Sequence, residues 1–151
     1  MPEIKTLDQH GRDFLANEEG ISLDPYLDDV GIPTIGIGCT YYPNGKKVTI
    51  KDDPLPSINA AWELFDTINS NFLLTVYSTT RDDINQNQFN ALLSLCYNIG
   101  TVGFKGSTVL RLVNIDPNDP KIADAFKMWK KAGGKPILLK RRIREAKLYF
   151  S

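Results

Sequence analysis

Two carboxylates and a hydroxyl follow one another at short spacings near the amino terminus. Asp28 comes nine positions after Glu19, and Thr34 comes six positions after Asp28. Hydrolysis of a glycosidic bond needs such a set, because one carboxylic acid protonates the leaving oxygen while a second carboxylate assists water or stabilises the cationic transition state. A hydroxyl can hold the attacking water. Glu19, Asp28 and Thr34 are therefore the candidate catalytic residues.

Each of these residues also has a purely structural interpretation. Glu19 could be a surface acid at a helix end, although Glu18 fits that description better. Asp28 could be an Asx-type turn residue, which is favoured if Asp29 serves the site in its place. Thr34 could be an ordinary β-branched strand residue. The chain has 18 acidic residues, so spacing alone does not choose between the two interpretations.

The elements that must position these residues are a short helix and a small sheet. Apolar spacing predicts a helix that stops at Gly20, with carboxylates at its end. From Tyr26 to Thr49, turn-forming glycine, proline and asparagine alternate with apolar residues, which predicts a small glycine-rich β-sheet. If its first strands form a hairpin, Asp28 on one strand faces Thr34 at the start of the next, and Glu19 approaches from the helix end.

The rest of the chain is predicted to be helical. Ser57 or Asn59 can cap a long helix that continues towards Tyr77 and connects two halves of the molecule. Further helices are expected before Gly100, after a Ser107 cap, after Pro120 and at the basic carboxyl terminus. The predicted organisation is one domain, 1–151, made of a small lobe over about 10–56, a linking helix over about 57–77 and a helical lobe over about 78–151. The predicted fold class is α+β and mainly helical.

Length and composition limit the class of protein. With 151 residues, 42% of them hydrophobic and 24% charged, the chain can bury the core of one ordinary domain. No apolar stretch approaches the roughly 20 residues of a membrane span, and the amino terminus does not resemble a secretory signal. We therefore expect a cytoplasmic starting location and no stable membrane insertion. Cys39 and Cys96 have no metal-ligand spacing and are interpreted as reduced thiols.

Charge is unevenly distributed although the net charge is zero. Residues 1–75 hold 12 acids and 5 bases, whereas the last 32 residues hold ten bases and two acids. This gradient favours either attraction to a polyanionic partner or a solvated helix face with ion pairs to Glu145 and nearby acids. No nucleic-acid recognition motif accompanies the basic segment, and we predict no nucleic-acid partner.

The motifs together resemble those of the phage-type lysozymes, the endolysin family of glycoside hydrolases (family 24). The resemblance covers about residues 10–151. It rests on Glu19-Gly20, Tyr26-x-Asp28, Gly31-x-x-Thr34-Ile-Gly-Ile-Gly38, the segment from Asn85 to Gly100, Gly106-Ser-Thr-Val-Leu110, Ala125-Phe-x-x-Trp129, Gly133-Gly134 and Arg141-Arg142-x-x-Glu145.

The resemblance implies a two-lobed lysozyme-like fold with the active cleft between the small sheet and the helical lobe. It implies that Glu19 is the general acid, that Asp28 supports the attacking water and that Thr34 positions this water. The implied reaction is inverting cleavage of the β-1,4 bond between N-acetylmuramic acid and N-acetylglucosamine in bacterial peptidoglycan, without cofactor or metal. Candidate substrate-binding residues are Tyr26, which could alternatively pack the sheet against a helix, Gly36 and Asn98.

One residue departs from the family pattern. After Gly38 the family usually has histidine, whereas this chain has Cys39, so we expect reduced or differently supported stability more than lost chemistry. A non-catalytic peptidoglycan-binding or structural protein on the same fold is the alternative function. We expect a monomer, because no heptad repeat or broad apolar stripe is left unpaired. The family resemblance further implies that the protein depends on a holin to leave the host cytoplasm and reach the wall for host-cell lysis.

Overall fold

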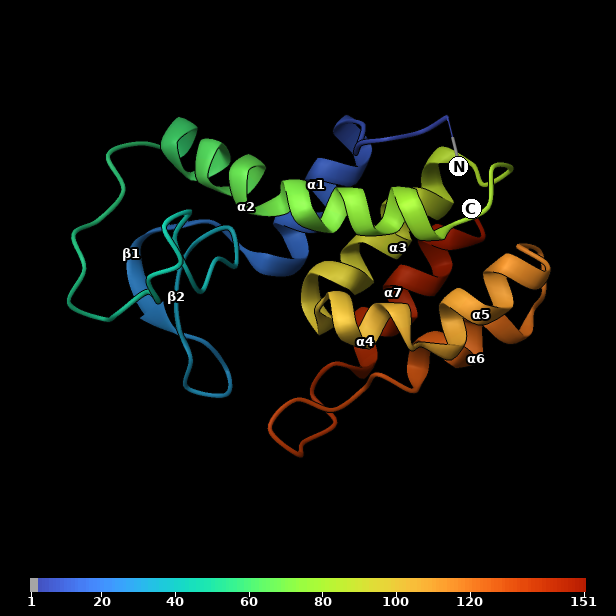
Figure 1. The fold of residues 1–151 in the computed structure, drawn as a ribbon. Coiled ribbons are helices and arrows are strands. Elements are labelled where there is room, and N and C mark those ends of the chain that lie inside the picture. Colours follow the sequence, from blue (N-terminus) through green and yellow to red (C-terminus); the bar gives the residue numbers. More distant parts are fainter. Residues whose placement is uncertain (1–2) are drawn as a thin grey trace. The chain divides into compact units, whose positions relative to one another are not determined.

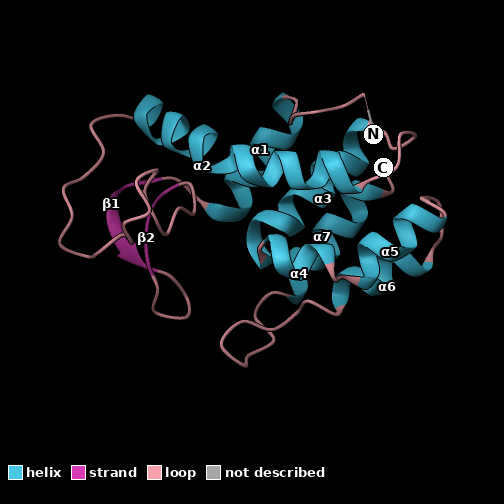
Figure 2. Cartoon of the chain, viewed as in Figure 1, coloured by secondary structure: helices cyan, strands magenta, loops and turns pink. Residues whose placement is uncertain are grey.

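The computed structural model describes residues 3–151 as a mainly helical chain with one small sheet (Figures 1 and 2). Met1 and Pro2 lie outside the described residues. They belong to the amino-terminal sequence that does not resemble a secretory signal. The elements in chain order are α1 (Gln9–Glu19), β1 (Ser22–Leu27), β2 (Pro33–Gly36), α2 (Ile58–Thr79), α3 (Gln86–Ile99), α4 (Thr101–Lys105), α5 (Thr108–Ile115), α6 (Lys121–Lys127) and α7 (Leu139–Tyr149). The α+β, mainly helical prediction is confirmed.

Contacts within the chain define two compact units. One contains Asp13–Ser70, and the other combines the chain up to Arg12 with Asn71–Ser151. Helix α2 has residues in both units, and so does α1. Among residues 3–151, no helix combines the length and the apolarity that a membrane span requires.

The smaller unit, Asp13–Ser70, holds the end of α1, the sheet and the start of α2. Strands β1 and β2 are antiparallel, with Tyr26 opposite Thr34 and Leu27 opposite Pro33. Ser57 caps α2, since its Oγ accepts a hydrogen bond from the Ala60 N–H at 3.1 Å. The core of this unit consists of buried apolar side chains: Leu15, Ile35, Ile37, Cys39, Val48, Ala61, Phe65 and Ile68.

The sheet differs from its prediction in two respects. Strand β1 begins at Ser22 and ends at Leu27, so Asp28 follows the strand and does not lie on it. Thr34 has Tyr26 as its cross-strand partner, not Asp28. The reason is the length of the turn, because the backbone hydrogen bond from the Asp28 N–H to the Ile32 carbonyl, at 3.0 Å, closes the hairpin at Asp28.

Helix α3 forms the centre of the larger unit. A capping box starts this helix, in which the Asn85 side chain accepts from the Gln88 N–H and the Gln88 side chain accepts from the Asn85 N–H. All nine residues from Gln88 to Cys96 are buried, which is typical of a helix enclosed by others. Helix α7 packs against α3 and α6, and α5 packs against α6. The helix ends at Ile99, before Gly100, as predicted.

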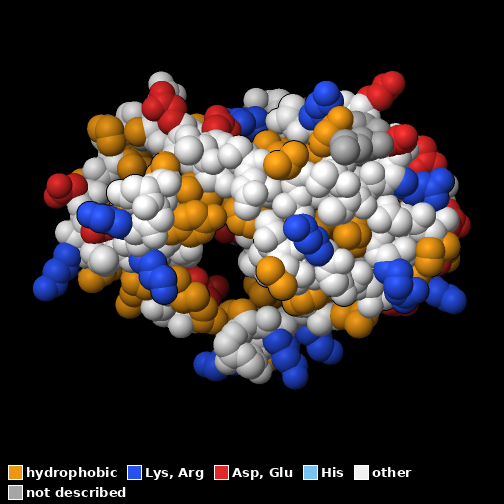
Figure 3. All heavy atoms as spheres, viewed as in Figure 1, with side chains coloured by type: hydrophobic (Ala, Val, Ile, Leu, Met, Phe, Trp, Pro, Cys, Tyr) orange, Lys and Arg blue, Asp and Glu red, His pale blue; other side chains and the backbone are white. Residues whose placement is uncertain are grey.

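A buried ion cluster joins α3 to α7. Glu145 is completely buried and accepts hydrogen bonds from Ser94 Oγ at 2.5 Å and Arg141 Nε at 3.2 Å. The guanidinium of Arg142 lies 2.6 Å from Glu145 Oε1, and this arginine is also fully buried. These two arginines therefore support the interpretation of the basic carboxyl terminus as a helix face with ion pairs to Glu145. The lysines of the same segment differ from these two arginines in their position. Lys and Arg side chains gather on the surface of the loop that precedes α7 (Figure 3).

Candidate active site

Glu19 is the last residue of α1, and its carboxylate lies directly against the backbone of Gly38. The helix ends there because Gly20 takes a φ of 73°, a left-handed conformation that glycine adopts without penalty. A Cβ atom at Gly38 would lie 2.0 Å from Glu19 Oε2 and 2.8 Å from its Cδ. Only a residue without a side chain can occupy position 38 while the carboxylate stays where it is.

Asp28 is held by the turn that it starts. Its Oδ1 atom accepts hydrogen bonds from the Val30 N–H at 3.0 Å and from the Ile32 N–H at 2.8 Å. Asp28 therefore is an Asx-type turn residue, as its structural interpretation expected. These two hydrogen bonds involve only one oxygen of the carboxylate, because no described residue forms a hydrogen bond with Oδ2. The turn thus fixes the orientation of a partly exposed carboxylate that keeps one oxygen for another partner.

Thr34 is buried in β2, with a side chain that is 3% exposed. Its hydroxyl donates a hydrogen bond to the Ile32 carbonyl at 2.9 Å. Because the hydroxyl proton is committed to this carbonyl, the oxygen lone pairs are left to accept a hydrogen bond from water. The same residue, Ile32, therefore holds both the Asp28 carboxylate and the Thr34 hydroxyl through its backbone.

Tyr26 connects the candidate residues electrostatically. It lies opposite Thr34 in the sheet, and Asp28 follows two residues later, in the turn after the strand. Burial raises the pKa of the Tyr26 phenol, and nearby carboxylates raise it further: Glu19, Asp28 and Asp29. The phenol thus stays protonated at neutral pH and can act as a hydrogen-bond donor.

The other two candidate substrate-binding residues have different surroundings. Gly36 is buried, and a Cβ atom there would lie 3.3 Å from Leu55 and 3.8 Å from both Ala61 and Leu64. The missing side chain thus allows close packing against the start of α2. Asn98 belongs to the helical unit, near the end of α3, and its buried Oδ1 has no hydrogen-bond partner among the described residues. Substrate binding by either residue stays a prediction.

Sequence reasoning did not select Gly38 as a site residue, although it included this glycine in the motif. The available signal was the pair of glycines in Gly36-Ile-Gly38, since alternating glycines within a strand pattern often mark a close approach of other groups to the backbone. Which group approaches Gly38 is decided by the end of α1 at Glu19, nineteen residues earlier in the chain. No set of three or more His, Cys, Asp or Glu side chains within residues 3–151 is arranged to hold a metal ion.

Comparisons with known proteins show the family of the chain. The phage lysozyme family model matches residues 16–145. The chain belongs to the phage lysozyme family. Among curated relatives of this family, the endolysin of Salmonella phage P22 is 43% identical over 153 residues, which covers 96% of this chain and 98% of the relative. Two more distant relatives, each 33% identical over 78% of this chain, are named SAR-endolysins.

Solved structures of phage lysozymes share the fold. A crystal structure of a P22 lysozyme mutant has a TM-score of 0.80 at 40% identity and covers 98% of this chain and 100% of that chain. The endolysin of Escherichia coli phage FAHEc1 has a TM-score of 0.85 at 29% identity and covers 100% and 97% of the two chains. The predicted lysozyme-like fold class is therefore confirmed.

Cys39, the departure from the usual phage lysozyme pattern, is a buried thiol in a tight turn. Its backbone exchanges two hydrogen bonds with Ile35, at 2.9 and 3.0 Å, and its Sγ lies 3.8 Å from the Ile37 carbonyl. Only 1% of the residue is exposed. Neither Cys39 nor Cys96 forms a disulfide bond within the described residues. The expected effect of Cys39 on stability stays a prediction.

Proposed function

We propose that this member of the phage lysozyme family is an endolysin that hydrolyses bacterial peptidoglycan to lyse the host cell. The proposed reaction is cleavage of the β-1,4 bond between N-acetylmuramic acid and N-acetylglucosamine with inversion. The observation that carries the proposal is the phage lysozyme match over residues 16–145, supported by the location of Glu19, Asp28 and Thr34 in one compact unit and by the pairing of Thr34 with Tyr26.

In the proposed mechanism Glu19 is the general acid. Its carboxyl group gives a proton to the leaving glycosidic oxygen as the bond to the sugar carbon breaks. Its contact with Gly38 limits where this carboxyl group can lie. A fixed position matters because proton transfer requires a donor within hydrogen-bond distance of the leaving oxygen.

Asp28 and Thr34 are proposed to hold the attacking water. The Oδ2 atom of Asp28 accepts a hydrogen bond from this water, and the Thr34 oxygen accepts a second hydrogen bond from it. Asp28 takes up the proton when the water attacks the sugar carbon from the side opposite to the leaving group, which gives inversion. The two backbone N–H groups on Oδ1 keep the Asp28 carboxylate oriented without neutralising it.

Further parts of the proposal concern the substrate and the route to it. Tyr26, Gly36 and Asn98 are proposed to contact the glycan. We also propose a monomer that acts on the wall after release from the host cytoplasm by a holin. Sedimentation of the purified protein tests the monomer, and lysis of cells with and without a co-expressed holin tests the route.

The decisive experiment compares two neighbouring glutamates. Purified wild-type protein, Glu19→Gln and Glu18→Gln are incubated with isolated Gram-negative peptidoglycan, and turbidity loss and released reducing ends are measured. We expect the Glu19→Gln rate to fall by at least about 100-fold, because the amide cannot donate the required proton, while Glu18→Gln keeps its activity. Circular dichroism controls for folding.

Two results would contradict the proposal. Full activity in Glu19→Gln would move the acid to another residue. A folded wild-type protein that sediments with several wall types but releases no reducing ends would favour the alternative, a non-catalytic peptidoglycan-binding protein on the same fold.

A further inference from the structure

A tight turn at Asn44-Gly45 forms the tip of the loop over 40–48. The Gly45 N–H donates a hydrogen bond to the Tyr42 carbonyl at 2.9 Å, and the Tyr42 N–H donates to the Lys46 carbonyl at 2.9 Å. Gly45 has a φ of 85°, so the turn is a three-residue hairpin loop that ends in a left-handed glycine. Asn44 precedes this glycine and is exposed to solvent.

Asparagine followed by glycine is a chemically labile pair. The backbone nitrogen of the second residue can attack the side-chain amide carbon of the first, and glycine obstructs this attack least because it has no Cβ atom. Asparagine is for this reason one of the thermolabile residues of proteins. Asn44 is the only asparagine of the chain that glycine follows. Its reactivity therefore depends on how the turn holds its side chain.

The Asn44 side chain is held in a position that suits this attack. Its Oδ1 atom accepts a hydrogen bond from the Lys46 N–H, two residues further on, at 2.9 Å. Such a bond folds the amide group back along the chain, beside the Gly45 nitrogen that lies between the two partners. It also polarises the amide carbonyl, whose oxygen becomes negatively charged when a nitrogen adds to its carbon. The turn thus supplies both proximity and activation of the carbonyl.

The closed turn also limits the rate of this attack. The Gly45 N–H is bonded to the Tyr42 carbonyl, so its nitrogen loses its proton only after that bond opens. Asp52 holds the closed form, because it accepts a hydrogen bond from Tyr42 Oη at 2.7 Å. Local opening of an exposed loop is a step with its own free energy. Removal of the Tyr42 anchor is therefore expected to make the Gly45 nitrogen available more often.

We propose that Asn44 is a modification site, at which the protein converts itself without an enzyme to aspartate and isoaspartate. The Gly45 nitrogen loses its proton to solvent and forms a bond to Asn44 Cγ, while the bond from Cγ to Nδ2 breaks and ammonia leaves. Water then opens the resulting five-membered succinimide ring. Attack at Cγ restores the original chain and gives aspartate. Attack at the Asn44 backbone carbonyl carbon breaks the original peptide bond and gives isoaspartate, in which the chain runs through Cβ and Cγ.

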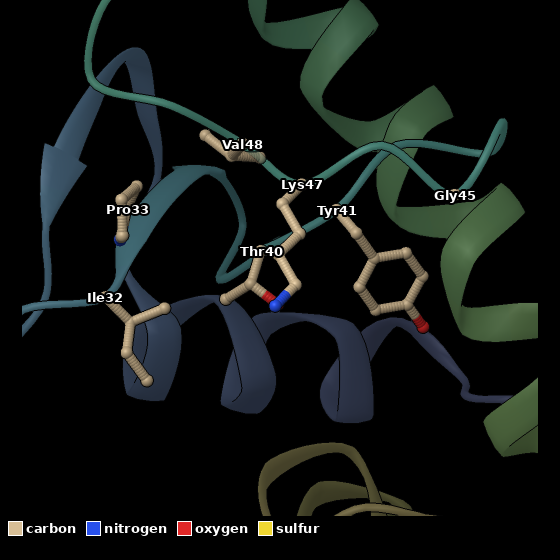
Figure 4. Close-up of a pocket in the computed structure, with 7 residues that line it drawn as sticks. All are labelled: Ile32, Pro33, Thr40, Tyr41, Gly45, Lys47 and Val48. Carbon is tan, nitrogen blue, oxygen red and sulfur yellow. The ribbon is translucent and has the colours of Figure 1, made fainter.

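The two products have different consequences for the loop. Aspartate keeps the course of the backbone and adds a negative charge next to Lys46. Isoaspartate adds one atom to the backbone between Tyr42 and Lys46, so the two turn hydrogen bonds no longer fit together. Gly45 also lines a pocket of about 470 Å³, whose residues are shown in Figure 4: Ile32, Pro33, Thr40, Tyr41, Gly45, Lys47 and Val48. Isoaspartate at position 44 therefore alters one wall of this pocket.

The test follows the purified protein during incubation at mildly alkaline pH. Peptide mass spectrometry measures, at each asparagine, the fraction that gains about 1 Da by exchange of an amide for a carboxylate, and fragmentation separates isoaspartate from aspartate. Asn114 is the internal control, since it is exposed and its Oδ1 accepts from the Arg81 N–H at 3.0 Å, but Ile115 follows it. We expect Asn44 to convert at least about tenfold faster than Asn114, because the branched Ile115 side chain obstructs the attack.

Two variants test the site and its control by the turn. Asn44→Gln keeps an amide but lengthens the side chain, which disfavours closure of the ring, and it should abolish the acidic form that accumulates in the wild type. Tyr42→Phe should raise the rate at Asn44 about fivefold, as the loss of one hydrogen bond would. In the isoaspartate form, hydrogen exchange should be faster at the amides of the 40–48 loop than in the unmodified protein.

Three results would overturn the inference. These are a rate at Asn44 no greater than that at Asn114, an acidic form that persists in Asn44→Gln, and an unchanged rate in Tyr42→Phe. The measurements use no peptidoglycan, so their outcome does not depend on the proposed function.

Discussion

The carboxylate of Glu19 and the Cα of Gly38 are in direct contact, so that a Cβ atom at position 38 would lie 2.0 Å from Glu19 Oε2. Gly38 also has a φ of 68°, which disfavours any residue with a side chain. The glycine therefore serves two purposes. It permits the turn that follows β2, and it leaves space for the proposed catalytic acid.

Substitution Gly38→Ala is expected to reduce activity far more than its loss of stability explains. The new methyl group displaces the Glu19 carboxylate, and a displacement near 1 Å can lower a rate by about 100-fold. Gly134→Ala is a matched control, because Gly134 has a φ of 78° and an added Cβ would meet nothing within 4 Å. Both variants should lose roughly 1–2 kcal/mol of stability from the backbone conformation. Rates of peptidoglycan cleavage below each variant's melting temperature would show whether only Gly38→Ala loses activity.

Neutralising Asp28 should separate its structural role from its proposed catalytic one. In Asp28→Asn, the amide oxygen can still accept the hydrogen bonds from Val30 and Ile32, so the turn is retained while the base is lost. We expect the cleavage rate to fall by about 100-fold or more, with a small change in melting temperature. Asp29→Asn, which removes the adjacent charge, should keep most of its activity. The reverse ranking would make Asp29 the working carboxylate.

The loop that carries the pocket should lose stability in acid through Asp52. This carboxylate accepts hydrogen bonds from Tyr42 Oη at 2.7 Å, from the Thr49 N–H at 2.9 Å and from Thr49 Oγ1 at 2.6 Å. The Thr49 side-chain bond is the main cause that lowers the pKa of Asp52 in the folded state. Its contribution is therefore complete above the unfolded pKa of about 3.9 and is lost as the pH falls below it. Urea unfolding between pH 2 and 7 should show a smaller acid-induced loss in Asp52→Asn than in Asp53→Asn.

The hydrogen bond between Tyr42 and Asp52 also predicts a loss of stability in alkali. Burial, followed by the hydrogen bond to Asp52, raises the pKa of Tyr42 to about 12. The protonated phenol therefore stabilises the folded state below the unfolded pKa of about 10, and this contribution disappears as the pH rises towards 12. Tyr42→Phe should remove that part of the alkaline dependence, which ultraviolet titration of the phenols and urea unfolding between pH 9 and 12 can measure. An unchanged alkaline limb in Tyr42→Phe would count against the hydrogen bond as its origin.

Loss of the Glu145 carboxylate should be among the most destabilising single changes in the helical unit. Glu145→Gln removes the negative charge that faces two buried arginines, Arg141 and Arg142. Breaking a buried ion pair in this way costs about 3–5 kcal/mol. Lys147→Gln, an exposed change on the same helix, should stay within about 0.5 kcal/mol of the wild type. Urea denaturation of both variants provides the comparison, and a loss below about 1 kcal/mol in Glu145→Gln would show that the cluster is not important for stability.

Local signals in the sequence determined most of the elements. Gly20 ends α1, Ser57 starts α2 and Ser107 starts α5, because each acts through its own backbone conformation or through bonds to neighbours in the chain. Burial was predicted less well. Helical spacing with other apolar residues predicts that Trp62 and Trp129 are buried in the core, yet both are partly exposed. Helical spacing identifies a face of a helix but not how completely other elements cover it.

The sequence by itself determined the family, the mainly helical class and the identity of Glu19, Asp28 and Thr34 as candidate residues, because these depend on residue types in a fixed order. Only the tertiary structure decided which atoms meet. It paired Thr34 with Tyr26 and not with Asp28, and it brought Glu19 onto Gly38. It also placed Gly45 against a pocket that Ile32 and Pro33 help to line. Such contacts depend on the register of the hairpin and on the packing of α1 against it, which involve residues distant in sequence, and local spacing carries no information about them.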